Sequence, residues 1–108
     1  MPATTPAQNG ILALEGEVDL HRAPEIREKL VEFVDRKVPR LLVDLSKVTY
    51  VDSSGLALFI ETLQRVKAYG GAFGLFGLGE SVRTLLHVAC LDQVFAIYPD
   101  EAAAVAGK

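Results

Sequence analysis

The stretch RLLVDLSKVTYVDSSGLALFI, residues 40–60, changes from one structural pattern to another in its middle. Its start, RLLVDLS, is nearly continuous in apolar residues, which is typical of a β-strand covered on both faces. From residue 55 onward, apolar residues recur at spacings of three and four, which predicts a helix with one buried stripe. Small or polar residues separate the two patterns: Asp52, Ser53, Ser54 and Gly55. The stretch therefore predicts a strand followed directly by a helix, with a polar segment at the junction.

Strand and helix patterns alternate along the rest of the chain. We expect strands at residues 11–16, 40–52, 72–76 and 93–98, and helices at residues 23–37, 55–69, 80–89 and 99–107. Strict alternation of this kind predicts an α/β domain with a largely parallel sheet. Residues 1–10, which contain Pro2 and Pro6, are either a frayed tail or a weak edge strand. We therefore assign a single domain to residues 11–106.

The composition excludes several classes of protein. The chain has 108 residues, half of them apolar, and a net charge of −3 without a long basic run, so we expect no nucleic-acid partner. No apolar stretch approaches the roughly 20 residues of a membrane span. The first ten residues lack the pattern of a secretory signal, so we expect a cytoplasmic protein. A lone cysteine allows neither a disulfide framework nor a zinc motif, and nothing in the sequence predicts a cofactor.

The polar junction at residues 52–55 has two interpretations. In the simpler one, a serine caps the helix, because its oxygen accepts a hydrogen bond from a free N–H group of the first turn. Two serines and an aspartate exceed what one cap needs, however. In the second, one serine is a phosphorylation switch, since phosphate adds about −1.5 to −2 charges. A partner packed against the helix start would then face an unwanted, desolvated charge and be expelled.

The residues around these serines do not support catalysis. The G-x-S-x-G pattern of a hydrolase elbow is absent, and only His21 and His87 could act as the base of a triad. We expect His87 to flank the core and Cys90 to be packed at a helix end. The glycines of GLFGLGE match neither a dinucleotide-binding fingerprint nor a P-loop. We therefore predict a protein that binds partners and is not an enzyme.

Four segments carry a resemblance to a known family: GEVDLHRAPEIREKL, LLVDLSKVTYVDSSGLALFI, AYGGAFGLFGL and LLHVACLDQVFAIYPDEAAAV. Together they resemble STAS domains, and among these the bacterial anti-sigma-factor antagonists, over about residues 11–105. The resemblance implies a mixed sheet of four to five strands with about four helices packed mainly on one side. It also implies a first strand within residues 1–10 that runs antiparallel to its neighbour.

The resemblance further implies a regulatory cycle called partner switching. The unmodified antagonist binds an anti-sigma factor that is also a serine kinase of the histidine-kinase-like ATPase class. The kinase phosphorylates the antagonist and thereby releases it, and a PP2C-type phosphatase resets it. The acceptor is the first hydroxyl after the motif aspartate, which corresponds to Ser53, while Ser54 corresponds to the helix cap. The residues that the resemblance places at the partner contact are Asp19, Asp52, Ser54, Gly55 and Leu56.

The resemblance leaves other roles open, and two positions differ from the usual family pattern. Asp19 could equally be an ordinary turn former, and STAS domains also serve as subunits of lipid-transport ATP-binding-cassette assemblies. Ala57 stands where a glycine often follows the motif leucine. Cys90 stands where a helix end often has glycine, so a left-handed backbone there would carry strain of about 1–2 kcal/mol. The charged outer faces of the helices lead us to expect a monomer.

Overall fold

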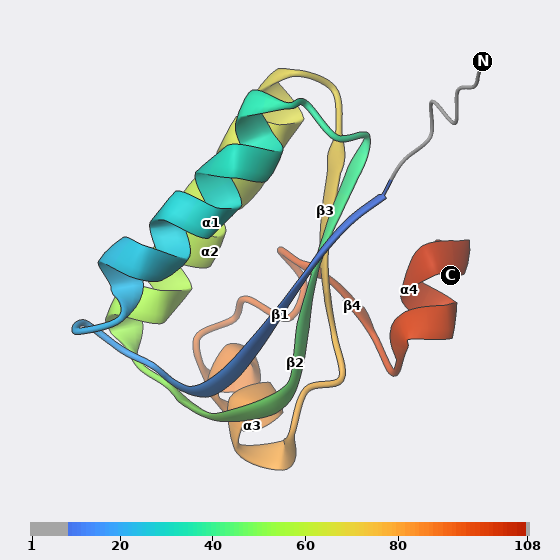
Figure 1. Cartoon of the computed structure of the whole chain (residues 1–108). Coiled ribbons are helices and arrows are strands. Elements are labelled where there is room, and N and C mark those ends of the chain that lie inside the picture. The colour runs from blue at the N-terminus through green and yellow to red at the C-terminus, as the bar shows by residue number, and fades with distance from the viewer. Residues whose placement is uncertain (1–8, 108) are drawn as a thin grey trace.

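The computed structural model describes residues 9–107 as alternating strands and helices (Figure 1). The elements are β1 (Asn9–Val18), α1 (Ala23–Asp35), β2 (Arg40–Val51), α2 (Ser53–Ala68), β3 (Ala72–Phe76), α3 (Glu80–Val88), β4 (Ala96–Tyr98) and α4 (Glu101–Ala106). The four described strands form one sheet in the order β1-β2-β3-β4, and every neighbouring pair is parallel. The predicted α/β domain with a largely parallel sheet is therefore confirmed.

The antiparallel first strand expected within residues 1–10 falls largely on residues 1–8, which lie outside the described residues. Asn9 and Gly10 already belong to β1, where they pair in parallel with Arg40 and Leu41. The mixed character of the sheet and a fifth strand therefore stay predictions.

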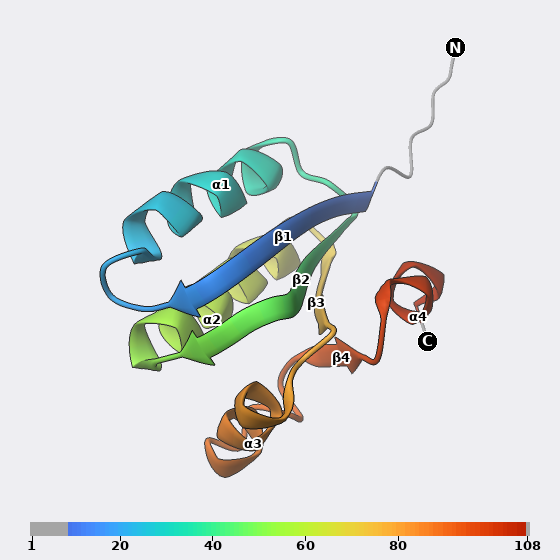
Figure 2. The same ribbon diagram turned by 60° about the horizontal axis from the view of Figure 1, so that its bottom comes forward.

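The helices cover the two faces of the sheet unequally (Figures 1 and 2). α1 and α2 pack against each other and, with α3, against one face, where Leu41, Val43 and Leu45 of β2 are buried. α4 lies on the opposite face, where Ala104 packs with Leu42. β2 is thus covered on both faces, as its apolar sequence predicts, and most of the helices lie on one side.

Several element boundaries differ from the prediction. β1 runs past residue 16 to Val18, because irregularities in its pairing near Ala13 and Gly16 return Val18 to the core. α2 begins at Ser53, two residues before its predicted start. β4 is three residues long, because residues 92–95 form a turn in which the N–H groups of Val94 and Phe95 donate to the Leu91 carbonyl.

The described part of the chain contains no helix that is both long enough and apolar enough to span a bilayer.

Candidate functional site

The predicted junction lies where β1 and β2 end side by side. Val18 pairs with Val51 in the last register of the two strands, so Asp19 and Asp52 follow neighbouring strand ends. Ser53 comes next as the first residue of α2, and its side chain is exposed. The structure therefore brings Asp19, Asp52 and Ser53 to one edge of the sheet, as the alternation of parallel strands predicts.

Asp52, and not Ser54, caps α2. Asp52 has an extended backbone (φ −106°, ψ −173°), and its Oδ1 accepts hydrogen bonds from the Ser54 and Gly55 N–H groups at 2.9 and 3.1 Å. The prediction that Ser54 is the cap is wrong, because α2 begins earlier than the apolar pattern indicated. The cap leaves both serine hydroxyls out of the hydrogen bonding that starts the helix.

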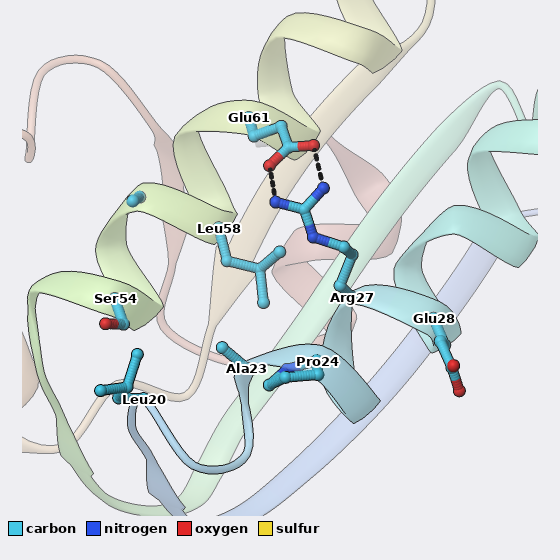
Figure 3. Close-up of a pocket in the computed structure, with 9 residues that line it drawn as sticks. Leu20, Ala23, Pro24, Arg27, Glu28, Ser54, Leu58 and Glu61 are labelled. Carbon is cyan, nitrogen blue, oxygen red and sulfur yellow. Dashed lines mark hydrogen bonds and ion pairs between the residues drawn. The ribbon is translucent and has the colours of Figure 1, made fainter.

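Ser54 is half-buried and faces a pocket of about 450 Å³ between α1 and α2 (Figure 3). Leu20 lies at the same end of the pocket, and Leu58 projects into its middle. At the other end, the Arg27 guanidinium donates two hydrogen bonds to the Glu61 carboxylate, at 2.7 and 2.5 Å. The pocket is thus apolar beside Ser54 and has an ion pair at its far rim.

Asp19 forms the turn between β1 and α1. Its Oδ1 accepts hydrogen bonds from the His21 and Arg22 N–H groups, both at 3.1 Å. Its carbonyl oxygen accepts from the N–H groups of Arg22 and Ala23 at 3.1 and 2.9 Å. The turn-forming role that the sequence left open is therefore present, and a partner contact by Asp19 stays a prediction.

Gly55 allows α2 to approach the strand ends closely. A Cβ added at this buried glycine would lie 2.8 Å from the Val18 carbonyl oxygen and 2.9 Å from Val51 Cγ1. The next residue, Leu56, is half-buried and packs against the main core. These contacts give both residues a packing role, and the partner contacts expected of them stay predictions.

The histidines and the cysteine lie differently from what the sequence indicated. His87 does not flank the core: its side chain is 79% exposed, and Nδ1 lies 2.9 Å from the Asp92 carboxylate. Cys90 is exposed and not packed, and its backbone is left-handed (φ 61°). Residues 9–107 hold no group of three or more side chains suited to a metal ion.

The fold and this site define a small α/β domain that presents an exposed serine beside an aspartate-capped helix start. The sequence matches the STAS domain family over residues 1–104, and the chain belongs to this family, among its anti-sigma-factor antagonists. Such antagonists are regulatory proteins and not enzymes.

Two relatives support the assignment to the anti-sigma-factor antagonists, and a third supports the fold. The anti-sigma-B factor antagonist of Bacillus subtilis is 36% identical over 84 residues, which cover 78% of this chain and 76% of the relative. An anti-sigma-factor antagonist from Mycobacterium paratuberculosis has a crystal structure with a TM-score of 0.84 and 28% identity, covering 92% of this chain and 84% of that chain. The Bacillus protein SpoIIAA in its phosphorylated form has a TM-score of 0.71 at 19% identity, with 98% and 96% coverage.

Proposed function

We propose that this protein is a partner-switching module controlled by phosphorylation at Ser53. In its unmodified form it binds an anti-sigma factor that is also a serine kinase of the histidine-kinase-like ATPase class. Transfer of the ATP γ-phosphoryl group to the Ser53 hydroxyl releases the complex, and a PP2C-type phosphatase restores the hydroxyl. The cycle takes place in the cytoplasm.

One observation carries this proposal: Ser53 is exposed at the first position of α2, while Asp52 supplies the helix cap. A kinase can therefore reach the hydroxyl, and esterifying it removes no hydrogen bond of the cap. The relative in Bacillus subtilis is named an antagonist of anti-sigma-B factor, which supports a partner of the anti-sigma class.

Charge explains how one phosphate can end binding without unfolding the domain. The phosphate adds about −1.5 to −2 charges at neutral pH. The positive end of the α2 dipole offsets part of this charge, by about 0.3–1 kcal/mol at an exposed site. The neighbouring Asp52 carboxylate opposes the phosphate, so the two local effects partly cancel. A partner seated on the helix start has no such compensation and must desolvate the added charge.

The test is phosphate mapping with two serine variants. Incubation with the cognate anti-sigma kinase and ATP should add one phosphate to the wild-type chain, at Ser53. Ser53→Ala should bind the kinase, accept no phosphate and remain bound. Ser54→Ala is the matched control for the acceptor assignment, since it removes the neighbouring hydroxyl, and it should still be phosphorylated at Ser53 and then released.

Two results would contradict the proposal. Phosphate on any residue other than Ser53 would reject the acceptor assignment. Isolation from cells with an ATP-binding-cassette ATPase, and no binding to the kinase, would support a subunit of a lipid-transport assembly in place of the switch.

A further inference from the structure

The Asp52 carboxylate connects two segments that lie far apart in the sequence. Its Oδ1 accepts the two hydrogen bonds that cap α2. Its second oxygen, Oδ2, accepts a hydrogen bond from the Leu20 N–H group at 3.2 Å. The Asp52 N–H group also donates to the Val18 carbonyl at 3.2 Å. Residue 52 therefore joins the start of α2 to the turn at residues 19–22.

The Leu20 bond is additional to what a helix cap requires. The cap of α4 offers a comparison within the same chain, because Asp100 also has an extended backbone and accepts through Oδ1, from the Ala103 N–H group at 2.9 Å. That cap uses one carboxylate oxygen. Asp52 uses one oxygen in the same way and directs the other to a different segment.

The turn that donates this bond presents an apolar side chain beside Ser54. Leu20 is 67% exposed and lines the pocket together with Ser54 and Ala57. The turn is shaped by its own hydrogen bonds, in which the His21 and Arg22 N–H groups donate to the Asp19 carboxylate. The Arg22 guanidinium also donates to the Glu15 and Glu17 carbonyls. These bonds fold the turn back on β1, whereas the Asp52 bond fixes it relative to α2.

We propose that Asp52 is a positioning residue for partner binding, through its Oδ2 atom. This oxygen fixes the turn at residues 19–22 against the start of α2, so that Leu20 and Ser53 form one rigid docking surface for the kinase. The inference rests on the proposed function, and it assigns to Asp52 an action through Leu20 in place of direct contact with the partner.

Asp52→Asn separates positioning from capping. Asparagine caps helices about as well as aspartate, so its Oδ1 keeps the bonds to Ser54 and Gly55. Its amide nitrogen replaces Oδ2 and cannot accept a hydrogen bond from the Leu20 N–H group. Hydrogen bonds to charged groups are strong enough that the Leu20 amide should exchange with solvent roughly tenfold faster. The amides of Ser54 and Gly55 should exchange as in the wild type.

Affinity for the kinase should fall roughly tenfold with the same change, because the turn must be ordered when the complex forms. Asp100→Asn is the matched control, since it makes the same substitution at a cap that uses one oxygen. It should leave both Leu20 exchange and kinase affinity unchanged. Leu20→Ala should lower the affinity without changing exchange at residue 54 or 55.

Three outcomes would overturn the inference. If Asp52→Asn binds the kinase as tightly as the wild type, positioning is rejected while the switch at Ser53 stands. If exchange rises at Ser54 and Gly55 and stays unchanged at Leu20, Asp52 acts as a cap alone. If the wild-type chain binds no kinase, the proposed function fails, and this inference fails with it.

Discussion

Ser53 is left exposed because its neighbours perform the structural tasks of the helix start. Asp52 caps the helix, and Gly55 lets the helix approach the ends of β1 and β2. A serine at the cap position itself would accept hydrogen bonds from the first turn, and modifying it would cost about 1 kcal/mol of helix stability. At the scale of the residue, the proposed acceptor and the cap are separate side chains.

Gly55→Ala should destabilise the domain by about 1–3 kcal/mol, because the added methyl group meets fixed backbone and packed valines. The Val18 carbonyl oxygen at 2.8 Å cannot move without disturbing the end of β1. Urea unfolding followed by circular dichroism measures the loss.

Gly79→Ala is the control for this variant. Gly79 is the residue before α3, its φ is −72°, and an added methyl group there meets no atom within 4 Å. The lost chain entropy of the unfolded state and the poorer cap should nearly cancel. An equal loss of unfolding free energy in the two variants would show that the close contacts of Gly55 are not what makes Gly55→Ala destabilising.

The residues of the site were predictable from the sequence to different degrees. The pattern change after Val51 places Ser53 at a strand end beside a helix, and the exposed position agrees with it. The cap was assigned to Ser54 because apolar spacing locates a helix start only to within a turn. The Asp52–Leu20 bond spans 32 positions in the sequence, and no local pattern could have indicated it.

At the scale of elements, the ends of the helices depend on single side chains. α2 ends at Ala68, and the hydroxyl of the following Tyr69 donates to the Val38 carbonyl at 2.8 Å. This bond ties the end of α2 to the connection between α1 and β2. Burial raises the pKa of Tyr69 above its ordinary value of 10.0, because the ionised phenolate is poorly solvated there.

Tyr69→Phe should lower the free energy of unfolding by about 1 kcal/mol at pH 8, through loss of this hydrogen bond. The pKa of Tyr69 is higher in the folded chain than in the unfolded chain. The stabilising contribution is therefore complete below pH 10 and decreases as the pH rises through the raised value. The difference between wild type and variant should shrink accordingly.

Urea titrations at a series of pH values between 8 and 11 measure this difference. Tyr50 and Tyr98 are present in both proteins and serve as an internal control. A difference that stays constant or grows with pH would contradict the role assigned to the Tyr69 hydroxyl.

Two elements, α3 and β4, show which features the sequence patterns did not predict. α3 buries Val82 and Leu86, whose spacing of four residues places them on one face of the helix. His87, expected to flank the core, is instead exposed and lies beside Asp92, five positions further along the chain. β4 is shorter than its apolar sequence suggested, since Val94 and Phe95 donate backwards to Leu91 and leave the ladder.

At the scale of the whole molecule, α4 lies apart from the α1–α2 surface. α4 lies on the opposite face of the sheet, where the Arg40 guanidinium donates to the carbonyls of Ala104 and Val105. The proposed docking surface is built from α2 and the turn before α1, on the face that carries most of the core. We therefore expect a charge added at Ser53 to alter this surface and to leave the core packing unchanged.

The affinity of the cognate anti-sigma kinase for the chain before and after phosphorylation at Ser53 tests this account most directly. Calorimetric titration should give a Kd at least roughly thirtyfold weaker for the phosphorylated chain, because an unpaired charge buried in an interface costs about 2–5 kcal/mol. The circular dichroism spectrum and the urea midpoint should stay the same. Equal Kd values for the two forms, with the phosphate verified on Ser53, would contradict the account.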